Sequence, residues 1–475
     1  MNRRTFVQLG AAGGMALLGG CGPIRELFGR RHAWRDLPAS NSGPVRRLLD
    51  RAGYGPVPGD PAGVAQIGHE AYVEEQLRAD LPEDPTVSLQ IARMDVFTLS
   101  ASEMGDISFK SAQAQLQQAA LLRAVYSPNQ LYERMVAIWS DHFNIYAPKA
   151  YGSYRIPTDY VEVIRKHALG KFPDMVLASA KSPAMLEYLD NHLNRKGTAN
   201  ENYARELMEL HTLGVHGGYT QRDVQEVARC FTGWTIESRF GRSRGRFLFD
   251  ESRHDDGEKF VLGVRIAPGL GVRAGERVIE IITSHPSTAS HIARKLCGHF
   301  VGAGFPDLER RVAAVYLQTK GDIRSMLREI LNSKELLESP PLPKRPFDFV
   351  VSALRAVDAG TDAGAPVLDH LDKMGHLPNM WPMPDGYPAD AHAWTGTLLA
   401  RWNFAYALAS GRIEGTKPRL GEGVKNLSEA RRIACEAVLG VPSKAVGSAP
   451  KAVRDAPTFQ SALFAALASP EFQWR

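Results

Sequence analysis

The residues with the clearest potential for chemistry lie at positions 199–220, in the stretch ANENYARELMELHTLGVHGGYT. If residues 200–214 form a helix, one arc of about 100° holds four polar side chains, Asn202, Arg205, Glu206 and Glu209. Two carboxylates one turn apart can act as general acid and base or as metal ligands, and an adjacent arginine can bind an anionic group. The same spacing also predicts two i,i+4 links, Asn202–Glu206 and Arg205–Glu209, on a solvated face. Spacing alone leaves both interpretations open.

His211 follows in the last turn of this predicted helix. A cation is favoured there by the helix dipole, and the imidazole could equally serve as a base or a ligand. The arc beside the polar one is apolar and is expected to face the core; it holds Tyr203, Leu207 and Leu210.

A second polar group precedes the helix, in YLDNHLNRKG. Asp190, Asn191 and Asn194 could bind a sugar or a cation through their side-chain oxygens. Aspartate and asparagine are also the residues that turns and caps prefer, so a structural role is the alternative.

Two histidines elsewhere have polar neighbours. His142 follows Asp141 inside the apolar helix WSDHFNIY, where a lone histidine is usually a core residue but an adjacent acid favours function. His254 lies in SRHDDGEKF, near Asp255 and Lys259, and these are functional candidates or ordinary turn residues.

The segment MWPMPDGYP combines aromatic rings with an acid. Trp381, Asp385 and Tyr387 could form an aromatic wall for a sugar ring, or a rigid, proline-pinned cover on the core.

The sequence lacks several common motifs for metal binding, nucleotide binding and hydrolysis. It has no HExxH or Glu-x-x-His metal pattern, no GxSxG elbow, no Walker loop and no GxGxxG after a strand. Cys230, Cys297 and Cys435 share no close spacing, so no CxxC metal site is predicted, and the first two are expected to be buried. We therefore predict no particular cofactor.

A net charge of only +5 over 475 residues argues against nucleic acid as a partner.

The N-terminus predicts export. Arg3 and Arg4 precede a short apolar, glycine-rich run, the pattern of a twin-arginine signal rather than of a membrane span. The run ends in a lipobox-like Leu-Gly-Gly-Cys, so residues 1–21 are predicted to be a signal peptide with Cys21 lipidated, and residues 22–40 a tether. The protein is then expected in the periplasm or at the cell surface, held to a membrane by that lipid.

Helical periodicity dominates the rest of the chain, so residues 41–475 are predicted to form a single large, mostly α-helical domain. Gly214 should end the helix that begins near Asn200, and Thr220 with Asp223 should cap the next one. This arrangement predicts a helix–turn–helix over residues 200–235. The one β-hairpin candidate is residues 245–266, with Asp-Asp-Gly at its middle.

The motifs resemble a bacterial family known as domain of unknown function 1800. NENYARELMELHTLGVHGGYTQRDVQEVARCFTGWTI looks like its signature, and the family's other motifs follow in order: AGYGPVP, MVAIWSDHFNI, SPAMLEYLDN, HPSTASHIARKL, GDIRSMLREIL, PFDFVVSALRA, PDGYP and RWNF. The resemblance implies a mostly helical, exported protein that often accompanies a sulfatase-like exported family, domain of unknown function 1501. It implies no reaction. One departure is Gly-His-Leu-Pro at 375–378, where the family often has Gly-Gln.

Together these features suggest an enzyme acting on an envelope or extracellular polymer of glycan type. Its expected catalytic residues are Glu206, Glu209 and His211. Its expected substrate-binding residues are Asp190, Asn191, Asn194, Asn202, Arg205, His142 and His254. The alternative is a non-catalytic binding or maturation partner of a co-exported sulfatase-like protein, with the polar cluster structural.

Overall fold

The computed structural model describes residues 43–100, 103–149, 152–238, 245–424, 426–441, 447 and 449–475. The predicted signal peptide, Cys21 and the tether lie outside them. The described chain is mostly helical, with only short two-stranded sheets, so the predicted all-α class is confirmed. Of the described helices, none combines the length and the apolar character that crossing a membrane requires.

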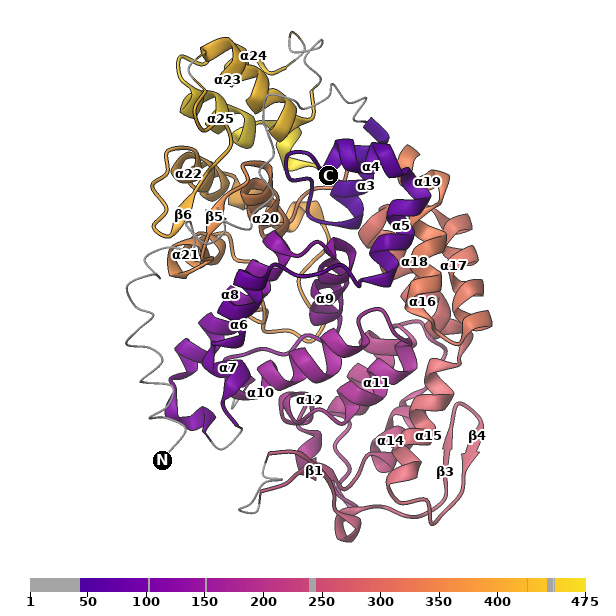
Figure 1. Ribbon diagram of the computed structural model, residues 1–475. Helices are drawn as coiled ribbons and strands as arrows, with labels where there is room; N and C mark the ends of the chain where they lie inside the picture. The colour runs from indigo at the N-terminus through magenta and orange to yellow at the C-terminus, as the bar shows by residue number, and fades with distance from the viewer. Residues whose placement is uncertain are drawn as a thin grey trace.

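The helix α9 (Gln130–His142) lies near the middle of the molecule (Figure 1). Leu131, Met135 and Ile138 recur on one of its faces and are buried, which fixes its orientation in the core. The helices before it are α3 (Gly43–Ala52), α4 (Asp60–Ile67), α5 (His69–Arg78), α6 (Pro85–Ala92), α7 (Asp95–Thr98) and α8 (Phe109–Tyr126). Those after it are α10 (Gly152–Asp159) with its π-helical continuation η3 (Tyr160–Arg165), α11 (Phe172–Ala180) and α12 (Pro183–Tyr188).

The signature segment folds as two packed helices. α13 (Asn202–Glu206) runs directly into a π-helical turn, η5 (Leu207–Thr212), and α13 packs beside α14 (Gln221–Cys230). Gly214 follows with a φ of 82°, the left-handed conformation in which helices often end. Thr220 and Asp223 form the expected capping box, so the predicted helix–turn–helix is confirmed.

The β structure after α14 consists of two hairpins rather than the one predicted. β1 (Trp234–Ile236) pairs with β2 (Phe247–Phe249), and β3 (Lys259–Val261) pairs with β4 (Val264–Ile266). The predicted Asp-Asp-Gly turn is wrong, because Asp255 accepts hydrogen bonds from Arg229 and from the Gly257 backbone between the two sheets. The tight turn of β3–β4 is Leu262–Gly263, both with positive φ.

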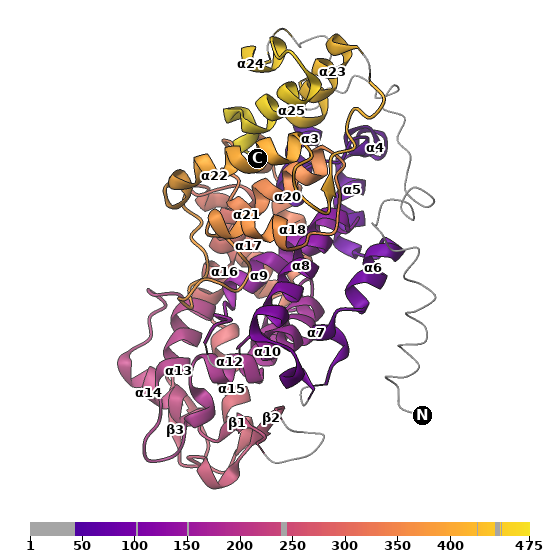
Figure 2. The ribbon, with the colours of Figure 1, turned by 90° about the vertical axis from the view of Figure 1, so that its left-hand side faces the viewer.

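The rest of the chain is again helical and returns toward α8 and α9. Its helices are α15 (Val272–Thr283), α16 (Pro286–Phe300), α17 (Pro306–Thr319), α18 (Ile323–Leu331), α19 (Lys334–Glu338), α20 (Pro346–Ala356), α21 (Ala365–Lys373), α22 (Leu398–Ala409), α23 (Leu427–Ile433) with the π-helical η8 (Ala434–Leu439), α24 (Lys451–Arg454) and α25 (Phe459–Ala468). A further two-stranded sheet joins β5 (Gly360–Thr361) to β6 (Thr416–Lys417). In both views the hairpins lie at the opposite end of the molecule from α23–α25 (Figures 1 and 2).

The core consists of two hydrophobic clusters. The first joins α3, α5 and α9 to α11–α18, and the second joins α8 to α20–α22 and the C-terminal helices. α8 takes part in both, since Leu116 belongs to the first cluster and Leu121 to the second. The boundary between the clusters therefore passes along α8. The described cysteines, Cys230, Cys297 and Cys435, are free and buried, as expected for the first two.

Candidate functional site

The last turn of α9 carries two adjacent polar residues that face different environments. Asp141 lines a cavity and pairs with Arg345, with 2.6 Å between Oδ2 and Nη1. The Nε2 atom of His142 lies 3.0 Å from the carbonyl oxygen of His211, and its Nδ1 atom lies 2.6 Å from Nζ of Lys295. Because Nε2 faces a carbonyl, it carries the proton, and Nδ1 accepts from the Lys295 amine.

Around His142 lies a group that we call the histidine–lysine cluster, in which His142 and His211 are buried and His291 and Lys295 are partly buried. Burial lowers the pKa of His142 well below its usual range, and the charge of Lys295 adds to this effect. Burial likewise lowers the pKa of His211 to about 3 and that of His291 to about 4. The three imidazoles are therefore neutral at pH 7.

Among the described residues, a fully buried ring nitrogen of His211 has no hydrogen-bond partner. His291 Nε2 lies 3.1 Å from the carbonyl oxygen of Leu210 and donates to it. The unpartnered nitrogen of His211 is Nε2, and the residue is 1% exposed. Within the described ranges, no three His, Cys, Asp or Glu side chains are arranged to hold a metal ion.

Near this cluster, three carboxylates lie within electrostatic reach of one another, and we call Glu206, Glu209 and Asp385 the acidic face. Partial burial raises the pKa of Glu206, and the charges of Glu209 and Asp385 raise it further, while Arg205 opposes the shift. Arg205 itself pairs with Glu201 at 3.0 Å. In the part of the chain that the structure describes, neither Glu206 nor Glu209 forms a salt bridge.

The loop 381–387 brings Asp385 to this face. Asn144 at the end of α9 donates to the carbonyl oxygens of Trp381 and Met383, at 2.9 and 2.6 Å. Gly386 lies so close to α9 that an added Cβ would be 2.1 Å from the Asp141 carbonyl oxygen. Trp381 Nε1 donates to Asp385 Oδ1 at 3.0 Å. The loop is thus fixed against α9, and its acid and indole lie together.

Two of the predicted substrate-binding residues bond to the backbone of a distant segment, and a third pairs with a lysine. Asn191 Nδ2 donates to the carbonyl oxygens of Phe231 and Trp234, and Asn194 Nδ2 donates to that of Ala228 at 2.9 Å. Both asparagines are buried. Asp190 has a φ of 61°, and its carboxylate pairs with Lys149 at 3.2 Å. The two asparagines thus have a structural role, through contacts across 34 to 43 residues of chain instead of a local turn or cap, and the Asp190 side chain forms no cap hydrogen bond.

The remaining predicted substrate-binding residues lie either on the signature helix α13 or near the β-hairpins. Asn202 donates to the Leu189 carbonyl oxygen at 3.2 Å, and Arg205 bonds to Glu201 and Gln221, so neither takes part in the expected i,i+4 links. His254 is buried beside Thr232 and Phe249, near the hairpins. The structure thus places His142 and His211 in one cluster, with Glu206 and Glu209 on the acidic face. It does not bring His254 to either.

The comparison with known proteins decides the family. A family model described as "Protein of unknown function (DUF1800)" matches residues 47–474. The chain belongs to the DUF1800 family. No curated protein and no solved structure matches it.

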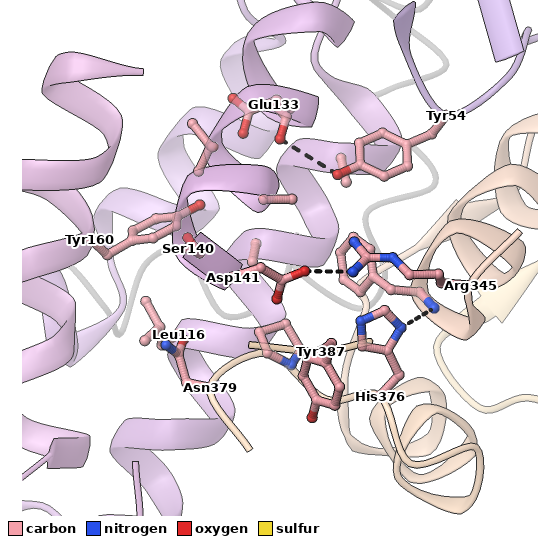
Figure 3. A pocket seen from close by; sticks show the side chains of 16 residues that line it. Tyr54, Leu116, Glu133, Ser140, Asp141, Tyr160, Arg345, His376, Asn379 and Tyr387 are labelled. Carbon is pink, nitrogen blue, oxygen red and sulfur yellow. Dashed lines mark hydrogen bonds and ion pairs between the residues drawn. The ribbon is translucent and has the colours of Figure 1, made fainter. Parts of the chain in front are cut away.

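Behind Asp141, this DUF1800 chain encloses a cavity between α8, α9 and the start of α20 (Figure 3). Its empty volume is about 640 Å³, including the part open to solvent. The wall is mainly apolar, with a polar end made by Asp141, Arg345 and His376.

Sequence reasoning missed several polar residues of this DUF1800 chain. His291 and Lys295 are four residues apart in HPSTASHIARKL, which places them on one helix face and is a signal that the sequence carries. Arg345 and His376 lie with Asp141 at one cavity although each is more than 200 residues away from it in the chain. No sequence pattern predicts contacts over such a separation.

Proposed function

We propose that this DUF1800 protein is an enzyme that hydrolyses a glycan-type polymer of the cell envelope or the extracellular space. The observation that supports this function is the acidic face, where three carboxylates from two segments lie together without an arginine paired to Glu206 or Glu209 in the described chain. Glycoside hydrolysis needs two carboxyl groups in different protonation states. Burial and like charge raise the pKa of Glu206, which favours the protonated form that a general acid needs.

In the proposed reaction, Glu206 is the general acid, since its pKa is raised. It gives its proton to the oxygen of the leaving sugar as the glycosidic bond breaks. Glu209 or Asp385 takes a proton from the attacking water, whose oxygen bonds to the anomeric carbon. One water is consumed and each acid–base group is restored after proton exchange with solvent.

The surroundings of the acids favour a neutral or amine-bearing glycan. Trp381 bonds to Asp385, and the charge of Glu209 helps to raise the pKa of Tyr219, so aromatic rings lie near the carboxylates. Such rings pack against the apolar faces of sugars. A polymer rich in carboxylate or sulfate groups would be repelled by the acidic face.

The proposal gives His211 a positioning role instead of a proton-transfer role. Its ring is buried and its pKa is about 3, so it stays neutral at the pH of the reaction. Its carbonyl oxygen accepts from His142, which ties the π-turn η5, and with it Glu209, to the end of α9.

Glu206→Gln tests the proposal. We expect wild-type protein to release reducing ends from a neutral or amino polysaccharide. In E206Q the rate of this release should be roughly 100 to 10,000 times lower. The wild-type rate should fall as pH rises through the pKa of Glu206, because the acid then loses its proton. Melting temperatures of the two proteins should nearly agree.

Glu201→Gln is the matched control. Glu201 immediately precedes α13 but is engaged by Arg205 and Gln221, so this variant should keep its activity. Equal losses in E201Q and E206Q would exclude the acid role. Unfolding of E206Q and E209Q would mean that the acids hold the fold.

The buried amide network of Asn191 and Asn194 favours a second candidate, a non-catalytic binding or maturation partner of a co-exported sulfatase-like protein. In that case the polar cluster is structural. The wild-type protein would then turn over none of the polysaccharides and would co-purify with the sulfatase-like protein.

We also propose export by the twin-arginine route and a lipid anchor on Cys21, supported by Arg3, Arg4 and the lipobox-like Leu-Gly-Gly-Cys. Cys21→Ser should abolish the incorporation of labelled palmitate and release the protein from the membrane fraction. Retention of label in C21S would contradict the assignment.

A further inference from the structure

The cavity beside Asp141 lies where the two hydrophobic clusters meet. Leu116, Val136 and Tyr160 line it from the first cluster, and Tyr54 and Phe347 line it from the second. Its empty volume of about 640 Å³ includes the part that is open to solvent, so a ligand can reach it from outside. The space exists partly because the facing positions on α8 and α9 are alanines, Ala120, Ala124 and Ala137.

The cavity is lined by rings on several sides. Tyr54, Tyr160, Phe347 and Tyr387 contribute aromatic surface, and the imidazole of His376 lies against Tyr387 with 4.3 Å between ring centroids. Figure 3 shows Tyr387 and His376 beside Asp141 at one end, with Tyr160 and Leu116 toward the other. A flat ring can pack against such walls without a polar group being buried unpaired.

The polar end offers one acceptor and one donor. Asp141 uses Oδ2 to bind Arg345, which leaves Oδ1 able to accept a hydrogen bond. Nδ1 of His376 accepts from the backbone N–H of Phe347 at 3.1 Å, so Nε2 carries the proton and can donate. A single hydroxyl group can satisfy both.

The charges at this end are already paired. Arg345 lies between Asp141 at 2.6 Å and Asp348 at 4.0 Å. Glu133, at the far wall, is held by Arg165 at 2.7 Å. An ionic ligand would leave one of these groups or its own charge uncompensated, which favours an uncharged ligand.

We propose that the cavity is a binding site for an uncharged aromatic compound with a hydroxyl group, that is, a ligand of the phenol class. The ring packs between the alanines and the aromatic side chains, and the hydroxyl donates to Asp141 and accepts from His376. This site is independent of the hydrolysis proposed for the acidic face.

Calorimetric titration of the purified protein with p-cresol, and with toluene as the matched ring without a hydroxyl, tests the proposal. We expect p-cresol to bind at least tenfold more tightly than toluene, since a single hydrogen bond already supplies about that ratio. Absence of p-cresol binding at millimolar concentration, or equal binding of the two compounds, would overturn it.

Two variants locate the ligand. Ala120→Leu fills the space beside α8 and should weaken p-cresol binding at least tenfold, whereas Ala314→Leu, the same change at an exposed site on α17, should leave it unchanged. His376→Phe keeps a ring but removes the donor, so it should reduce the preference for p-cresol over toluene, while the hydrogen bond to Asp141 remains.

Melting temperatures establish that each variant folds, and Ala137→Leu replaces A120L if that variant does not. Binding of p-cresol to A120L or A137L as tightly as to wild type would place the ligand elsewhere and contradict the proposal.

Discussion

At the scale of single residues, Lys295 is unusual because its amine lies against an imidazole. Its Nζ is 2.6 Å from His142 Nδ1, and in the described chain no carboxylate forms a salt bridge with it. Burial lowers the pKa of Lys295 to about 8, although Asp141 and Asp385 oppose the shift. At pH 7 the three imidazoles are neutral and Lys295 carries most of the positive charge of the cluster; above about pH 8 the amine is mainly neutral as well.

Lys295 should therefore react with acetic anhydride at a lower pH than an ordinary lysine. With a pKa of about 8 it is half neutral at pH 8, a neutral fraction roughly a hundred times that of a lysine at the usual value. Peptide mass spectrometry after brief labelling between pH 6 and 10 gives the profile, with exposed Lys334 as the reference for reagent decay. A Lys295 profile that rises only together with that of Lys334 would contradict the prediction.

At the scale of elements, residue patterns predicted each helix start, helix end and cap that depends on contacts between residues close in sequence. The capping box of α14, the glycine that ends η5 and the positions of α8 and α9 all follow from residues within a few positions. The hairpin turn was misplaced because Asp255 is engaged by Arg229, from a different element.

The π-turn η5 explains why the predicted polar arc was only partly right. A wheel of 100° per residue assumes an α-helix, but residues 207–212 are wound more widely. His211 therefore turns into the core, whereas Leu210, expected there, is only partly buried. Glu206 precedes the turn and lies partly buried, as a position beside the core should. Periodicity could not reveal the change of winding, nor that Asp385 would join the acids.

Thr220→Ala tests the contribution of the capping box. The Thr220 side chain accepts from the Asp223 backbone, and the Asp223 carboxylate accepts from the Thr220 backbone at 2.8 Å. Loss of the hydroxyl should lower the free energy of unfolding by about 1 kcal/mol in urea titrations. Thr220→Ser keeps the oxygen and should remain close to wild type; similar losses in both variants would show that the methyl group matters more than the cap.

At the scale of the whole molecule, the two hydrophobic clusters meet at a buried ionic centre. Asp348 of α20 lies 2.6 Å from Arg134 of α9 and 3.9 Å from Arg475. Arg134 also lies over the ring of Tyr54, 4.1 Å from its centroid. The centre thus connects α9, α20 and the last described residue, segments that are distant in sequence. No sequence pattern predicts such a junction, because each partner comes from a different region.

Asp348 should make the whole fold sensitive to acid. Burial alone would raise the pKa of Asp348, but Arg134, Arg475 and Arg345 together lower it below its usual range. A carboxylate with a lowered pKa in the folded state contributes stability above its unfolded pKa of about 4, and this contribution is lost as pH falls below that value.

Asp348→Asn removes that charge and leaves the arginines without their partner. The expected loss is roughly 3–5 kcal/mol at pH 7, and the difference from wild type should shrink as pH falls below about 4, where Asp348 of the unfolded chain begins to gain a proton. Denaturant titrations at pH 7 and at lower pH measure both effects. Asp307→Asn is the control, since Asp307 pairs with Arg310 on the surface, where both side chains are about three-quarters exposed, and it should change stability by less than about 1 kcal/mol. If D348N and D307N unfold alike at pH 7, the two clusters are held together by apolar packing alone, and the ionic centre does not stabilise their junction.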